Sequence, residues 1–229
     1  MGENKRGAGL TRQMMIDTAL RLLDEVGLDG LTVRRLASEL GVQSPALYWH
    51  LRNKQELLDG MADAIVLAAG MGPPREGESW QDWLARRARA YRDSLRAHRD
   101  GARLVANAAS LSPATIRMFD EELTAMVRRG FTPVLALRTI TALTRYVNGC
   151  VLQEQTERQA SSGTPADRFA ALAELLDGGM EATLLTAFRQ SGGSFAEDAF
   201  EHGLRTLIDG TATALRLSPP PLPESRPPV

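Results

Sequence analysis

The sequence predicts an all-α protein with two helical domains, and three observations support this prediction. Apolar residues recur at helical spacing along most of the 229 residues, whereas no segment shows the alternation expected of a strand. A hydroxyl residue followed by proline, which is typical of a helix start, occurs at Ser44-Pro45, Ser112-Pro113 and Thr132-Pro133. Glycines and prolines interrupt the pattern between residues 70 and 77, which indicates a domain boundary.

The composition is that of an ordinary globular chain, with 43% hydrophobic and 24% charged residues. The single cysteine, Cys150, excludes an intramolecular disulfide and favours a cytoplasmic location. No apolar run approaches the ~20 residues of a membrane span, so we expect no association with a membrane. The net charge of −1 does not indicate a nucleic-acid-binding protein, so any basic surface must be local.

The N-terminal domain is predicted to comprise residues 1–70. Residues 1–9 lack periodicity and are expected to form a flexible arm. Three helices are then predicted, with a connecting helix after them, over residues 11–26, 32–40, 44–51 and 54–69. Gly27 is expected to end the first helix, with a loop over residues 28–31. Asn53 and Glu56 have the spacing of a capping box, which predicts that the connecting helix starts there.

Residues 71–217 are predicted to form the C-terminal domain, and residues 218–229 a disordered proline-rich tail. Apolar periodicity predicts helical or short apolar segments over residues 79–98, 102–109, 112–127, 132 to beyond 153, 166–176, 180–188 and 194–217. A flexible loop is expected over residues 158–164, which are small and polar.

Residues 32–51 have the pattern of a helix-turn-helix. Thr32 is predicted to cap the first helix of the motif. Gly41 suits the turn, because a tight connection favours a residue without a Cβ. Ser44 is expected to cap the second helix with its hydroxyl, and Pro45 stands where no backbone N–H is needed.

The second helix of this motif directs aromatic side chains outward. Leu47 and Leu51 can face the core, which leaves Tyr48 and Trp49 on the open side. Two interpretations remain for these aromatics, namely packing against neighbouring helices and contact with DNA. The local charge favours DNA, because residues 30–54 carry four basic residues and one acidic residue. Lys5 and Arg6 in the arm either touch DNA as well or stay solvated.

These residues resemble the TetR family of transcriptional regulators. The likeness lies in residues 31–37, 41–42, 47–51 and 53–54, and in Leu57-Leu58-Asp59. It extends to the tetracycline-repressor branch of that family through residues 77–82, 98–102, 130–131 and 149–152. The resemblance implies a homodimer that binds double-stranded operator DNA and encloses a small-molecule effector in its C-terminal helices.

The resemblance also assigns DNA contacts. Arg34 resembles a base-reading arginine, Arg35 lies beside it, and Lys54 resembles a phosphate-contacting lysine. The contact positions of the recognition helix are occupied by Ser44, Pro45, Ala46, Tyr48, Trp49 and His50. The dimer contact is expected to be a four-helix bundle built from residues 132–155 and 195–217 of each chain.

The drug-binding positions of the tetracycline-repressor branch differ here. They are occupied by Gly70, Arg87, Val105, Ala108-Ala109-Ser110, Arg145 and Gln153. Val105 stands at the position of a metal-coordinating histidine, and a valine side chain cannot bind Mg²⁺. We therefore expect no metal and no cofactor, and an effector other than a magnesium–tetracycline complex.

A different pocket is expected in its place. Its predicted lining is Arg87, Tyr91, Val105, Asn107, Met118, Arg145, Asn148 and Gln153. Arginines and amides among apolar walls would suit an anionic or polyoxygenated organic ligand. The alternative is that Arg87 and Arg145 are ordinary exposed helix residues, and that Tyr91 only packs in the core.

The favoured function is therefore a repressor that a small organic effector releases from a palindromic operator. One alternative is a DNA-binding dimer without an effector. The other is an enzyme that uses the C-terminal cavity, but no catalytic residues are predicted, because the three histidines, His50, His98 and His202, lie far apart in the sequence.

Overall fold

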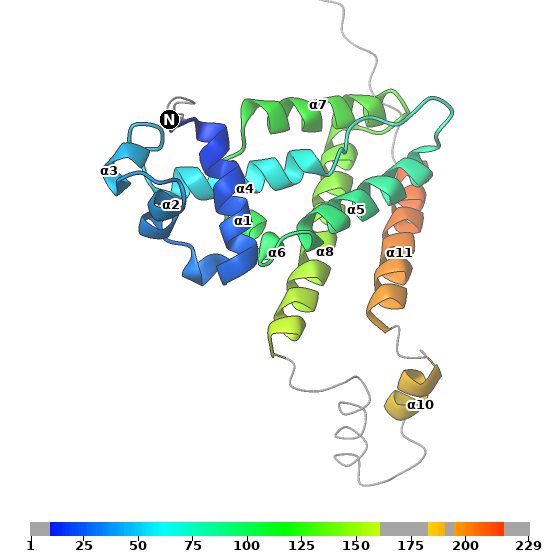
Figure 1. Ribbon diagram of the computed structural model, residues 1–229. Helices are drawn as coiled ribbons and strands as arrows, with labels where there is room; N and C mark the ends of the chain where they lie inside the picture. The colour runs from blue at the N-terminus through cyan, green and yellow to red at the C-terminus, as the bar shows by residue number, and fades with distance from the viewer. Residues whose placement is uncertain (1–9, 161–182, 191–194, 218–229) are drawn as a thin grey trace, which may run out of the picture. The chain divides into compact units, whose positions relative to one another are not determined.

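The computed structural model describes residues 10–160, 183–190 and 195–217, and all secondary structure in these ranges is helical (Figure 1). The predicted all-α class is confirmed. The helices are α1 Arg12–Gly30, α2 Val33–Glu39, α3 Ser44–Leu47, α4 Lys54–Ala68, α5 Trp80–Arg96, α6 Gly101–Ala106, α7 Pro113–Val127, α8 Pro133–Ala160, α10 Thr183–Gln190 and α11 Phe195–Leu217. In this part of the chain, no helix has both the length and the hydropathy of a membrane span.

The chain divides into two compact units. The first comprises Met1–Gly72 and Arg89–Glu122, and the second comprises Pro73–Ala88 and Leu123–Val229. Helices α5 and α7 each cross from one unit to the other. The first break in this division lies close to the boundary predicted near residue 70, but residues 89–122 return to the first unit.

The core of the first unit is formed mainly by α1 and α4. The fully buried side chains of α1 include Met15 and Leu23, and those of α4 include Met61 and Ile65. Gly60 permits the close approach of the two helices, because a Cβ built there would lie 2.9 Å from Ile16 Cδ1. This contact between α1 and α4 holds α4 in place, and the first residue of α4, Lys54, belongs to the predicted DNA-binding surface.

Side chains cap three of the four N-terminal helices, and the caps at Thr32 and Asn53 were predicted. The hydroxyl oxygens of Thr11 and Thr32 each accept a hydrogen bond from a backbone N–H in the first turn, at 3.1 Å. Asn53 Oδ1 accepts one from Glu56 N at 2.9 Å, and the Glu56 carboxylate reaches back to Arg52 N. The predicted Ser44 cap is wrong, because α3 begins at Ser44 itself and no side chain caps this helix.

The end of α1 also differs from the prediction. Gly27 has φ 71° and kinks the helix, but helical structure resumes and continues to Gly30, so residues 28–30 do not form a loop. The kink is held by Asp100, whose Oδ2 accepts a hydrogen bond from Leu28 N at 2.8 Å. Arg103 adds a two-pronged ion pair to Asp29, with N–O distances of 2.8 and 2.9 Å.

In the second unit, α8 and α11 pack against each other. The rings of Tyr146 and Phe200 stack with centroids 5.7 Å apart, and Tyr146 Oη donates to the carbonyls of Ala199 and Phe200. Helix α8 continues to Ala160, so the loop expected from residue 158 cannot begin before residue 161. The helix predicted over residues 166–176 and the predicted tail lie outside the described residues.

A half-buried ion pair connects α5 to the segment before it. Arg86 Nε lies 2.7 Å from Glu78 Oε1, and Arg86 Nη2 lies 2.9 Å from Oε2. The Arg86 guanidinium holds the pKa of Glu78 at about 2. Glu78 therefore stays ionised through the whole neutral range.

Candidate nucleic-acid interface

The helix-turn-helix holds its aromatic side chains at the surface. Leu47 and Leu51 are buried, with 2% and 5% exposure, and they anchor α3 and the turn that follows it. Trp49 is 87% exposed and Tyr48 is 55% exposed. Packing against neighbouring helices therefore does not account for Trp49, whereas Tyr48 partly covers an apolar hollow that Val33 also lines.

The cationic side chains of the motif are available for contact. Arg34, Arg35 and Lys54 are exposed, and the imidazole of His50 is exposed beside them; none of these side chains makes a hydrogen bond or an ion pair within the described part of the chain. Of the other predicted contact residues, Pro45 is exposed, whereas Ser44 and Ala46 are half-buried. The predicted DNA-contact residues thus lie within one short stretch on α2, α3 and the start of α4.

Glu39, the acidic residue of the motif, forms an ion pair with Arg21 of α1. Glu39 Oε1 pairs with Arg21 Nη2 at 2.5 Å, and Arg21 also pairs with Glu25. The hydrogen bond and the charge of Glu39 raise the pKa of Arg21 above its usual value. The local field at the motif is consequently dominated by its unpaired cations.

Helix α4 is tied to the segment between α6 and α7. Asp59 accepts hydrogen bonds from Ala109 N at 2.9 Å and from Ser110 Oγ at 2.6 Å. Asp63 accepts from Ser112 N at 3.1 Å and from the Thr115 hydroxyl. Burial acts to raise the pKa of Asp59, but hydrogen bonds from Ser110, Gln55 and the backbone outweigh it, so this pKa lies below its usual value.

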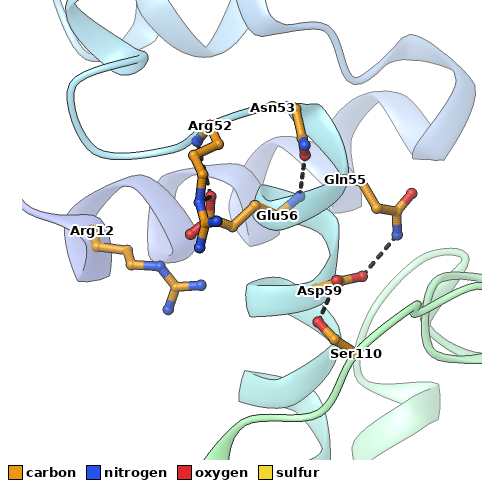
Figure 2. Close-up of a pocket in the computed structure, with 7 residues that line it drawn as sticks. All are labelled: Arg12, Arg52, Asn53, Gln55, Glu56, Asp59 and Ser110. Atoms are coloured by element: carbon orange, nitrogen blue, oxygen red, sulfur yellow. Dashed lines mark hydrogen bonds and ion pairs between the residues drawn. The ribbon is translucent and has the colours of Figure 1, made fainter.

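A polar pocket of about 320 Å³ lies beside the first two turns of α4 (Figure 2). It is lined by Arg12, Arg52, Asn53, Gln55, Glu56, Asp59 and Ser110. The sequence did not predict this pocket, because Arg12 and Ser110 are far from the helix-turn-helix in the chain. Only the charge of Arg52, next to the capping box, was a sequence signal for it.

The residues predicted to bind an effector are divided between the two units. Tyr91, Val105, Asn107 and Met118 belong to the first unit, and Arg87, Arg145, Asn148 and Gln153 belong to the second. The alternative that both arginines are exposed is wrong for Arg87, which is 1% exposed, whereas Arg145 is exposed. Tyr91 is buried, with 3% exposure, and Gln153 is exposed and bonds to Glu157.

Asn148 has the feature expected of a ligand-binding group. Its Oδ1 atom is buried and accepts no hydrogen bond from any described residue. A buried acceptor without a donor costs about 1–3 kcal/mol, and a ligand donor would recover this free energy. By contrast, Asn107 is exposed and its amide donates to Arg103 O at 2.7 Å, within the same helical turn.

Comparison with known families finds two matches. Residues 15–61 match "Bacterial regulatory proteins, tetR family". Residues 73–215 match "Tetracyclin repressor-like, C-terminal domain".

Individual relatives cover nearly the whole chain. The tetracycline repressor protein class A from transposon 1721 of Escherichia coli is 38% identical over 200 residues, which are 86% of this chain and 88% of the relative. A solved structure of a possible TetR family transcriptional regulator from Streptomyces coelicolor A3(2) is 36% identical, with a TM-score of 0.76, and covers 89% of this chain and 99% of that chain. ActR from Streptomyces coelicolor in complex with (S)-DNPA is 26% identical, with a TM-score of 0.75, over 91% of this chain and 100% of that chain.

Proposed function

The chain belongs to the TetR family of bacterial regulatory proteins, so it is a DNA-binding transcriptional regulator, and we propose how it works. It is a cytoplasmic homodimeric repressor that a small organic effector releases from a palindromic operator. The observation that supports this most directly is the exposure of Tyr48 and Trp49 beside cationic side chains that make no hydrogen bond or ion pair within the described chain. Such a surface suits contact with phosphates and base edges in a major groove.

Helix α4 is the proposed link between effector and DNA. It begins with Lys54 at the interface, and its carboxylates Asp59 and Asp63 hold the segment between α6 and α7. A ligand that shifts this segment would therefore move Lys54 and change the spacing of the two recognition helices in the dimer. The ligand then selects the form that does not bind the operator.

The proposed effector is a small organic molecule other than a magnesium–tetracycline complex. Val105 offers no metal ligand, and Asn148 Oδ1 offers a buried acceptor to a donor group of the ligand. Arg87 and Arg145 are the proposed cationic contacts for an anionic or polyoxygenated compound. The ActR structure, which holds (S)-DNPA, supports an effector of another class in this fold.

The DNA-binding part of the proposal is tested with duplexes selected from a randomised pool by the wild-type protein. We expect the selected sequence to be a palindrome and the Tyr48→Ala and Lys54→Gln variants to bind it more weakly in fluorescence anisotropy titrations. Selection of no sequence, or equal binding by both variants, would contradict the proposal.

The effector part is tested by thermal melting against a panel of small organic acids and polyketide-like compounds. A binding compound should raise the melting temperature and weaken operator binding in the same concentration range. The variant Asn148→Ala should lose part of that shift. If no compound raises the melting temperature, the remaining candidate is a DNA-binding dimer without an effector.

A further inference from the structure

The polar pocket beside α4 is distinct from both the recognition helix and the proposed effector site. It lies between the start of α1, the turn before α4 and Ser110 (Figure 2). The two acidic side chains in its lining already have donors within the protein. Both oxygens of Asp59 accept hydrogen bonds, from Gln55 and Ala109 on one and from Ser110 on the other, and Glu56 Oε2 accepts from Arg52 N at 2.8 Å.

The basic side chains of the pocket are much less engaged. The Arg12 guanidinium makes no hydrogen bond or ion pair with any described residue. The Arg52 side chain is 92% exposed and forms one long ion pair, in which its Nε lies 3.6 Å from Glu56 Oε2, beyond hydrogen-bond distance. Both guanidinium groups extend into the same space beside α4 (Figure 2). Glu56 offsets part of the Arg52 charge, whereas Arg12 has no ion-pair partner among the described residues, so an anion between the two guanidinium groups would be stabilised.

The structure of α4 places Arg12 in this position. A Cβ at Gly60 would lie 3.2 Å from Arg12 Nη2, so the missing side chain leaves room for the guanidinium against the helix. The turn that carries Arg52 is fixed by the Asn53 cap and by the bond from Arg52 N to Glu56. Arg12 is the first residue of α1, which Thr11 caps, and Arg52 lies in the turn just before α4, so both backbones are held by capped helix starts. Such an arrangement suits a site for one anion.

We propose that this pocket binds a phosphate group through Arg12 and Arg52. The favoured source is the operator backbone, because Arg52 and Asn53 directly precede the interface residue Lys54 and the pocket opens along the same end of α4. Arg12 and Arg52 would then hold a backbone phosphate next to the helix-turn-helix, and this contact would raise the affinity for DNA without contributing to sequence specificity. If the phosphate group belongs to the operator, this inference rests on the proposed function. A free compound that carries a phosphate group is the other possible occupant of the pocket.

The test measures operator affinity as a function of salt for the full-length wild type and for Arg12→Gln and Arg52→Gln. The control is Arg117→Gln, which removes the same charge from an exposed position of α7 outside the pocket. Each lost phosphate contact lowers the slope of log K against log salt by about 0.9, so a symmetric dimer should lose about 1.8. The affinity ratio between operator and scrambled duplex should stay unchanged, and so should the binding of the control. Circular dichroism confirms that each variant is folded.

A second measurement distinguishes the source of the phosphate. Thermal melting of the wild type and Arg12→Gln is compared in inorganic phosphate and in chloride at equal ionic strength. A phosphate-specific stabilisation that Arg12→Gln abolishes, with an unchanged salt slope for DNA, supports a free phosphate compound as the occupant. The inference is overturned if both pocket variants match Arg117→Gln in the salt slope and in the melting experiment. If the wild-type protein binds no DNA, the proposed function is contradicted. The phosphate inference is then tested by the melting experiment alone.

Discussion

Arg34 and Lys54 both present cationic groups at the interface, but we expect their removal to have different effects. Arg34→Gln should lower discrimination between operator and single-base variants by about 1–3 kcal/mol, because arginine pairs with guanine edges. Lys54→Gln should weaken all duplexes equally, because phosphate contacts carry no sequence information. Anisotropy titrations against the operator and its variants measure both effects. Equal loss on every duplex for Arg34→Gln would contradict its predicted role as a base reader.

Glu78 is expected to make stability depend on acid pH. Its pKa is about 2 in the folded chain, below the ordinary value of 4.5, so the Arg86 pair stabilises the fold fully above pH 4.5. That contribution is lost as the pH falls from 4.5 to about 2. Glu78→Gln should therefore lower the free energy of unfolding by roughly 1 kcal/mol at pH 7 and by much less near pH 2. Urea unfolding at several pH values checks this, and a difference that does not depend on pH would contradict it.

Single-residue roles were predictable from the sequence where they depend on local pattern. The exposure of Trp49 and the caps at Thr32 and Asn53 follow from spacing within one turn of helix. The burial of Arg87 was not predictable, because a charged residue on a helix face is normally solvated and only tertiary packing covers it. The place of exposed Arg12 in the pocket was not predictable either, because the other lining residues lie on distant parts of the chain.

At the scale of helices, two glycines of the first unit should respond differently to alanine. A Cβ at Gly101 would lie 2.4 Å from the backbone oxygen of Leu95, which cannot move without distorting α5. At Gly60 the nearest atoms are the flexible ends of Ile16 and Arg12. Gly101→Ala should therefore destabilise the protein by about 1–3 kcal/mol. In Gly60→Ala, the gain in helix propensity of roughly 1 kcal/mol should offset most of the crowding.

Urea unfolding of both variants, with circular dichroism at 222 nm as the helix signal, measures the difference. The two variants share the same chemical change, so the contrast reports the kind of neighbour rather than the loss of a glycine. Equal midpoints for the two variants would show that the backbone near Leu95 adapts.

Most helices were predictable because apolar periodicity depends only on the local sequence. The observed helix ends differ from the predicted ones where the local sequence does not determine where a helix starts or stops. Residues 28–30 are helical because Asp100 and Arg103 bind the segment after Gly27, a contact 72 residues away in the chain for Leu28. At α3 the capping position falls on Gln43, which makes no side-chain bond, and the helix predicted over residues 44–51 is wrong beyond Leu47, where residues 48–50 form a turn. Such shifts at helix ends are set by packing, which sequence spacing does not encode.

At the scale of the whole molecule, dimerisation should determine operator affinity. The two linked DNA-binding domains of a dimer bind a palindrome together as one bivalent unit, whereas a half-site binds only one of them. We expect the half-site duplex to bind at least 100-fold more weakly than the full palindrome. Sedimentation of the complex should give two chains per palindrome. One chain per duplex, or equal affinity for both duplexes, would contradict the proposed dimer.

Apolar periodicity predicted the fold class, whereas the overall composition predicted neither the fold class nor the function. A net charge of −1 gives no sign of DNA binding, because basic and acidic residues nearly balance over the whole chain, although residues 30–54 carry a local excess of basic residues. DNA binding was predictable from residues 32–54, where motif, aromatics and charge coincide, whereas the effector-released repressor followed only from the resemblance over most of the chain. The effector was not predictable, because its proposed contacts are spread over residues 87–153 and no local motif connects them.

The kink at Gly27 has a consequence for how the protein is made. The partners of Leu28 and Asp29 are Asp100 and Arg103, and residues 73–88 of the intervening chain belong to the other unit. On a ribosome, the N-terminal helices therefore leave the exit tunnel long before the residues that lock them are synthesised. We expect the DNA-binding domain to reach its native structure only after residue 122 has left the ribosome. A nascent chain that ends at residue 70 should therefore be readily degraded by proteases.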